Sequence, residues 1–137
     1  MDTLKRIPFA EVLAASHILW TNKSLADQIA SDSLEIINKT YRRKFSFFNG
    51  RKSKWIVGGL LYLLGYRYDS IKKQNELADV LGTTDGTIRD SYRQWLKTFP
   101  DLFMDVIGKF ANDEQLRYFV RIDLIKEAEL KKIVSFS

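Results

Sequence analysis

Apolar residues recur at helical spacing along most of the chain, and this pattern predicts a series of amphipathic helices. Residues 9–20 form the first such segment, with Pro8 at or before its first turn. Residues 25–45 carry a longer stripe at steps of three and four, and they predict a helix of about five turns. The members of this stripe are Leu25, Ile29, Ser33, Ile36 and Thr40. Asn22 or Ser24 can cap the second helix.

Residues 53–66 are almost wholly apolar. A stretch of this length is typical of a buried helix and is too short for a membrane span. Gly58 and Gly59 lie in its middle, where each costs about 1 kcal/mol relative to alanine. We expect the close approach of neighbouring helices to compensate for this cost, so this segment should be the central helix.

Residues 71–99 predict two helices joined by a tight turn. Leu77, Val80 and Leu81 mark the first helix, and Gly82 can end it in the left-handed conformation. The second helix has an apolar face made of Ile88, Tyr92, Trp95, Leu96 and Phe99. Its opposite stripe carries Gly86, Arg89, Asp90, Arg93 and Lys97. This arrangement is typical of a DNA-binding helix-turn-helix, although two helices of an ordinary bundle with a solvated outer face give the same pattern.

Beyond Phe99 the pattern is less regular. Pro100 ends the helix, and an apolar segment up to residue 110 predicts a further short helix. Residues 116–124 alternate like a strand but lie between helix-favouring flanks, and residues 125–136 are most simply a last helix.

Charge and composition narrow the function classes. The 22 Lys and Arg residues exceed the 17 Asp and Glu residues, and the net charge of +5 favours polyanionic partners. The absence of cysteine excludes disulfides and thiolate metal sites, and it fits an intracellular protein. Because no long apolar segment or signal peptide is visible, we expect a cytoplasmic protein without a membrane partner.

The positive charge is concentrated in one segment. Eight Lys or Arg residues and no acidic residue lie between Lys39 and Arg67, and seven of the eight fall between Lys39 and Lys54. A solvated loop is one interpretation. Uncompensated cations repel one another, however, so we favour a surface that faces phosphates.

Residue patterns for catalysis are absent from the sequence. The glycines lie in no phosphate-binding loop, and no Ser-His-Asp set or metal-spaced carboxylate cluster is indicated. His17, the single histidine, lies among apolar residues and is expected to be structural. We therefore expect a non-enzyme with no catalytic residue, bound metal, cofactor or small-molecule substrate.

Residues 74–103 resemble the end of the second cyclin-type repeat of transcription factor IIB and its archaeal counterparts. The strongest elements of this resemblance are Glu76-Leu77-Ala78, Thr87-Ile88-Arg89, Ser91-Tyr92-Arg93 and Pro100-Asp101-Leu102-Phe103. The similarity extends upstream to about Leu25. It includes the turn Gly50-Arg51-Lys52-Ser53, which is similar to the Gly-Arg-Ser-Pro turn of the family with one lysine inserted.

The resemblance implies an all-α fold in one domain, residues 1–137. A single five-helix cyclin-like repeat with its helix-turn-helix would cover about residues 22–110, preceded by an extra N-terminal helix and followed by a C-terminal extension, residues 111–137. In the family, this helix-turn-helix lies in the major groove upstream of the TATA box, beside the TATA-binding protein. The implied partners are double-stranded DNA and the TATA-binding protein or the transcription machinery.

Two departures from the family limit the expected function. The chain has no cysteine for a zinc ribbon, and it has room for one repeat in place of two. We therefore expect a shortened transcription regulator or an antagonist that occupies the promoter site. Such a protein would be associated with the nucleoid, and a source in archaea or their viruses is consistent with it.

The resemblance also assigns DNA contacts by position. Arg89 falls on a base-reading arginine, and Gly86 stands where the family has an apolar contact residue. Asp90 would repel phosphates unless it accepts a hydrogen bond from cytosine. The full set of expected DNA-contacting residues is Gly86, Thr87, Arg89, Asp90, Arg93, Lys97, Lys72, Lys73, Arg42, Arg43, Arg51, Lys52 and Lys54.

The alternative function is a cyclin-type protein-binding module without a DNA role. A DNA-binding protein should place residues 39–54 and the cations of the second helix on one continuous surface. A protein-binding module should show an exposed apolar groove.

Overall fold

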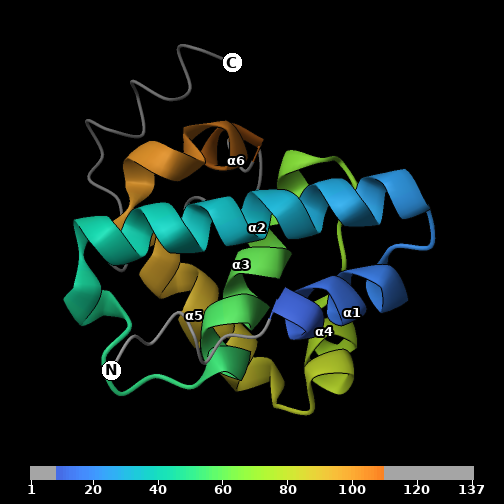
Figure 1. Ribbon diagram of the computed structural model, residues 1–137, viewed down its shortest axis with the longest axis horizontal. Helices are drawn as coiled ribbons and strands as arrows, with labels where there is room; N and C mark the ends of the chain where they lie inside the picture. The colour runs from blue at the N-terminus through green and yellow to red at the C-terminus, as the bar shows by residue number, and fades with distance from the viewer. Residues whose placement is uncertain (1–8, 110–137) are drawn as a thin grey trace. The chain divides into compact units, whose positions relative to one another are not determined.

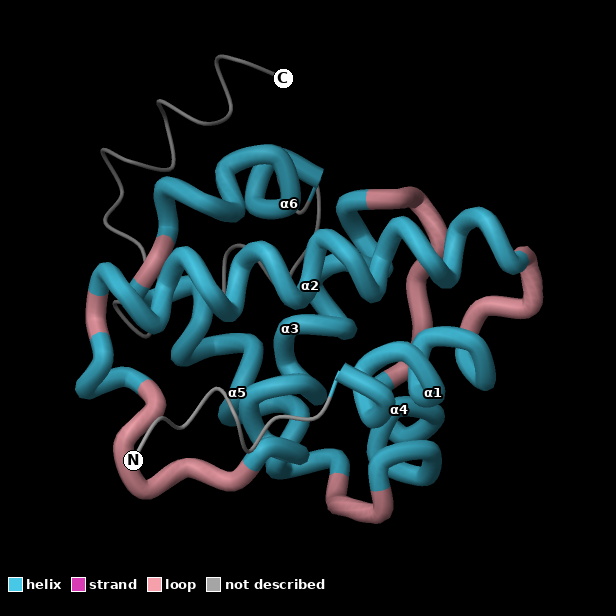
Figure 2. Tube along the Cα trace, in the orientation of Figure 1, coloured by secondary structure: helices cyan, strands magenta, loops and turns pink. Residues whose placement is uncertain are grey.

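The computed structural model describes residues 9–109, and every regular element in this range is helical (Figures 1 and 2). The elements are α1 (Phe9–Leu19), α2 (Lys23–Arg43), the 3₁₀ turn η2 (Phe45–Phe47), α3 (Ser53–Arg67), α4 (Gln74–Leu81), α5 (Asp85–Thr98), the 3₁₀ turn η3 (Pro100–Phe103) and α6 (Met104–Lys109). The predicted all-α class is confirmed over this range. The expectations for residues 116–124 and 125–136 lie outside the described residues.

The chain divides into two compact units, the first ending at Tyr92 and the second beginning at Arg93. The boundary lies inside α5. The first unit therefore holds α1 to α4 with the first half of α5, and the second holds the rest of α5 with η3 and α6. The expectation of one domain over residues 1–137 stays a prediction.

Helix α1 packs against α2 and α4 through one narrow stripe. Val12, Ala15 and Leu19 are buried at steps of three and four, and Trp20 closes the end of the helix, with its Nε1–H donating to the Ser70 carbonyl at 2.8 Å. Ile18 lies off this stripe and is 66% exposed.

Helix α2 packs across α3 in the first unit (Figure 1). The Asn22 side chain caps it by accepting from the Leu25 N–H at 3.0 Å, as one of the two expected caps. The predicted stripe is buried, apart from a half-buried Leu25. Its two polar members, Ser33 and Thr40, each donate a hydroxyl hydrogen bond of 2.7 Å to a backbone carbonyl four residues earlier. The stripe therefore buries no unsatisfied hydroxyl group.

Helix α3 has a continuous run of buried residues from Ile56 to Gly65. A Cβ atom added at Gly58 would lie 2.5 Å from Ile88 Cδ1, and one added at Gly59 would lie 2.6 Å from the carbonyl carbon of Ser91. The first half of α5 therefore crosses α3 so closely that the crossing leaves no room for side chains. This confirms the expected reason for the paired glycines.

The turn between α4 and α5 is defined by local chemistry. Gly82 has φ 68° and ψ 44°, and the N–H of Thr83 donates to the Ala78 carbonyl at 2.9 Å, which closes the end of α4. Thr84 Oγ1 accepts from the Thr87 N–H at 3.2 Å and caps the start of α5. The predicted pair of helices joined by a tight turn is confirmed.

The second unit has its own aromatic cluster. The ring centroid of Trp95 lies 5.7 Å from that of Phe99 and 6.1 Å from that of Phe103. Val106 and Ile107 of α6 are also buried. The predicted apolar segment after Pro100 thus forms a 3₁₀ turn followed by a short helix.

Candidate nucleic-acid interface

The outer face of α5 begins with exposed residues. Gly86, Arg89 and Asp90 are all exposed, and the Arg89 side chain makes no hydrogen bond or ion pair with another described residue. A Cβ atom at Gly86 would lie 3.8 Å from Thr84 Oγ1, which is ordinary van der Waals contact. Packing among residues 9–109 therefore does not require glycine at position 86, and none of these residues pairs with the guanidinium of Arg89.

Thr87 takes part in the start of the helix. Its hydroxyl oxygen lies 3.0 Å from Thr84 Oγ1, and its N–H donates to the same atom. Thr87 is half-buried. We assign it primarily to the cap of α5.

Asp90 lies against α3, a contact that the sequence did not predict. Its Oδ2 accepts a hydrogen bond of 2.8 Å from Trp55 Nε1. The guanidinium carbon of Arg51 lies 4.0 Å from the Trp55 ring centroid and 4.8 Å from that of Phe47, and Arg51 Nη1 donates to the Phe47 carbonyl at 3.1 Å. Arg51, Trp55 and Asp90 therefore form one cluster at the junction of α3 and α5.

The electrostatics of Arg51 follow from this cluster. Desolvation by the aromatic rings lowers the pKa of Arg51, and the negative charge of Asp90 opposes this effect. Because an arginine pKa starts far above neutrality, the guanidinium stays charged. Arg51 is thus a half-buried cation stacked on aromatic rings, and its expected contact with DNA stays a prediction.

A lysine of the basic segment, residues 39–67, contacts the turn before α5. Lys54 Nζ donates to the Gly82 carbonyl at 3.3 Å, and Lys52 is exposed immediately before α3. The start of α3 is thereby attached to the turn between α4 and α5. The continuous surface expected between residues 39–54 and the cations of α5 stays a prediction.

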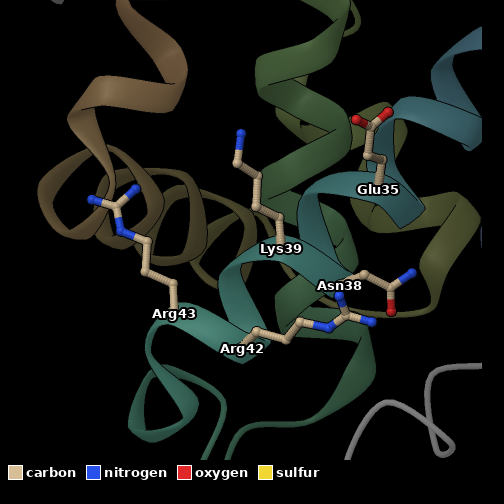
Figure 3. A pocket seen from close by; sticks show the side chains of 5 residues that line it. All are labelled: Glu35, Asn38, Lys39, Arg42 and Arg43. Atoms are coloured by element: carbon tan, nitrogen blue, oxygen red, sulfur yellow. The ribbon is translucent and has the colours of Figure 1, made fainter.

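The other end of the basic segment forms a separate feature on α2. Glu35, Asn38, Lys39, Arg42 and Arg43 line a shallow depression of ≈ 810 Å³ (Figure 3). Figure 3 shows Lys39 and Arg43 extending to the same side of the helix, whereas the guanidinium of Arg42 reaches back beside Asn38. Cations in the last turns of a helix also stabilise it through its dipole, so this cluster has a structural role with or without a ligand.

The remaining cations occupy different environments. Lys73 is exposed before α4, and its N–H donates to Glu76 Oε1 at 3.1 Å, while Lys72 is half-buried. In the second unit, Lys97 is exposed, whereas Arg93 is half-buried and its Nε is shielded from solvent. Arg67, the last cation of the basic segment, pairs with Asp32 at 3.1 Å.

Three further observations concern other kinds of site. His17 Nε2 lies 2.7 Å from Asp27 Oδ1, which accounts for the single histidine as a contact between α1 and α2. Within residues 9–109, no three His, Asp or Glu side chains are grouped so that they could hold a metal ion. None of the described helices combines the length and apolar character needed to cross a membrane.

Comparisons of the chain with protein-family models, curated proteins and solved structures find no match. The resemblance to the factor IIB repeat therefore rests on the residues quoted above.

Proposed function

We propose that the protein binds double-stranded DNA through α5 and acts as a shortened transcription regulator with a cyclin-like repeat. The observation that carries this proposal is the outer face of α5, where Arg89 is exposed in the helix's first half without a partner among the described residues. The opposite face of the same helix is anchored at Ile88 and Ser91 against α3. A rigidly held helix that presents an arginine in this way suits the major groove.

The chemistry of the interface follows from the side chains present. Arginine can donate two hydrogen bonds to guanine O6 and N7, and this pairing distinguishes guanine from the other bases. Gly86 lets the helix backbone approach the duplex closely, since it adds no side chain. Lys52 and Lys54 supply positive charge beside the turn and suit phosphate contacts, which set position without specifying sequence.

The promoter role rests on the factor IIB resemblance. A single cyclin-like repeat with a helix-turn-helix would dock beside the TATA-binding protein at promoter DNA. Such a protein would act as a regulator or as an antagonist at the promoter.

The test is the selection of preferred duplexes from a random pool, followed by titration on the winning sequence and on a scrambled control. We expect Arg89→Ala to cost about 1 to 3 kcal/mol on the preferred site and little on the control. Lys97→Ala is the matched variant, because it removes an exposed cation from the same helix. It should weaken binding to both duplexes alike.

Two results would contradict the proposal. If no duplex is enriched, α5 does not recognise sequence. If Arg89→Ala weakens both duplexes equally, Arg89 contacts phosphate and its assignment from the factor IIB resemblance is wrong.

A further inference from the structure

Two consecutive residues of α5 hold a single residue of α3. The Ser91 hydroxyl donates to the Trp55 carbonyl and accepts from the Gly59 N–H at 3.2 Å. Asp90 accepts from the Trp55 indole N–H at 2.8 Å. Both the main chain and the side chain of Trp55 are therefore attached to α5, an arrangement that we call the Trp55 clamp.

The Trp55 clamp extends to the basic residues at the start of α3. Arg51 stacks on the Trp55 ring at 4.0 Å, and Lys54 reaches the Gly82 carbonyl at the helix-turn-helix turn. Lys52 lies between these two fixed points in the sequence. The clamp therefore restricts where the cations of residues 51–54 can lie relative to the first half of α5.

A carboxylate is otherwise unfavourable at this position. Asp90 follows Arg89 directly and is exposed, so its charge would repel the phosphates of a bound duplex. A charged acceptor, however, makes a stronger hydrogen bond to the indole N–H than a neutral one. The nearby positive charge of Arg51 also offsets part of the repulsion.

The geometry points to Asp90 and Trp55 as positioning residues that hold Lys52 and Lys54 in register with Arg89, so that phosphate contacts align the base-reading side chain. This inference rests on the proposed function. It assigns Asp90 an intramolecular role in place of a contact with DNA. It also brings Trp55, which the sequence analysis did not single out, into the recognition site.

The contact itself can be tested in the protein without DNA. Nuclear magnetic resonance of ¹⁵N-tryptophan protein would follow hydrogen exchange of each indole N–H, and Trp55→Phe would identify the Trp55 signal. We expect Asp90→Ala to accelerate exchange at Trp55 by about fivefold or more, in line with the loss of one hydrogen bond. Trp20, whose indole donates to the Ser70 carbonyl, is the internal control and should not change. Unchanged exchange at Trp55 would overturn the inference.

The positioning role is tested on the preferred and scrambled duplexes. Trp55→Phe keeps an aromatic ring for Arg51 and removes the N–H donor, so it should lower the preference ratio by about three- to tenfold, as Asp90→Ala should. Asp90→Asn keeps an acceptor oxygen and removes the charge. We expect it to retain the ratio while it tightens binding to both duplexes.

The variants also separate this inference from the proposed function. If Asp90→Ala and Asp90→Asn both tighten binding and leave the ratio unchanged, Asp90 acts only as a charge and the inference is overturned, while DNA recognition stands. The same conclusion follows if Trp55→Phe leaves the ratio unchanged. If the wild-type protein has no preferred duplex, the proposed function fails and this inference fails with it, even where indole exchange confirms the contact.

Discussion

Position 86 presents a glycine at the exposed start of α5, where the surroundings leave space for a side chain. Neither a positive φ nor a close neighbour requires glycine there, in contrast to Gly82 and Gly59. The described residues therefore give no packing reason for a glycine at this position. Under the proposed function, the duplex approaches this face.

Substitutions at position 86 test this interpretation. Gly86→Ala should raise the free energy of unfolding by up to about 1 kcal/mol, because alanine favours the helix and meets no clash. Gly86→Val places methyl groups on the outer face, where they can contact the methyl group of thymine, so the selected duplex should change at one position. The measurements are denaturant titration and repeated selection. An unaltered preference in Gly86→Val would mean that residue 86 does not reach the base edges.

At the scale of elements, most helix boundaries could be predicted because their causes are local. Asn22 caps α2, Gly82 ends α4 and Pro100 follows α5, and each signal depends on a few neighbouring residues. The exposure of Arg89 was also expected from the sequence, since helical periodicity places it outside the apolar stripe that contains Ile88 and Tyr92. Ile18 is exposed although it is apolar, because α1 packs through the narrow stripe of Val12, Ala15 and Leu19.

The Trp55 clamp could not be predicted in the same way. Trp55 and Asp90 are 35 residues apart, and their contact depends on how α3 and α5 cross. The signals that existed were indirect: the paired glycines predicted a close crossing, and Trp55 follows Arg51 by four residues. Neither indicates which residue of the other helix lies opposite.

The close crossing of α3 and α5 predicts different stabilities for two matched glycine variants. Gly59→Ala would place a methyl group against the main chain of Ser91 and Tyr92, which cannot move without shifting α5, so it should destabilise by about 2 kcal/mol or more. Gly58→Ala meets the end of the flexible Ile88 side chain, and its gain in helix propensity should keep the change within about 1 kcal/mol.

Denaturant unfolding of both variants measures the difference in their free energies of unfolding. The comparison requires that the dependence of this free energy on denaturant concentration is the same in both variants. Equal effects of the two substitutions would show that the crossing adjusts as easily at the main chain as at a side chain. A larger substitution, Gly58→Leu, should exceed about 3 kcal/mol, since no movement of Ile88 alone makes room for it.

In the first unit, cations of the described residues gather in two places. One lies at the start of α3 and the turn before α5, and the other is the depression on α2. If one duplex contacts both and about five phosphates are neutralised, the logarithm of the binding constant should fall against the logarithm of salt concentration with a slope near −4 to −5.

Two double variants, each of which removes two positive charges, test whether each of these places contacts the duplex. Lys52→Ala with Lys54→Ala, and Arg42→Ala with Arg43→Ala, should each reduce the magnitude of the slope by about two, measured on random duplex DNA over a salt series. If the arginine pair leaves the slope unchanged, the depression on α2 is outside the interface. If the lysine pair leaves it unchanged, the duplex does not approach the turn before α5.

The three tryptophans differ in solvent exposure, and this difference makes one of them a useful intrinsic fluorophore. Trp20 and Trp95 are almost completely buried, at 2% and 0% exposure, whereas Trp55 is half-exposed between a guanidinium and a carboxylate. Indole emission depends on nearby charge and on solvent, so Trp55 is the fluorophore whose intensity and wavelength respond to events at the junction of α3 and α5. A ligand that reaches this junction can therefore be followed by intrinsic fluorescence, with no label attached to either partner.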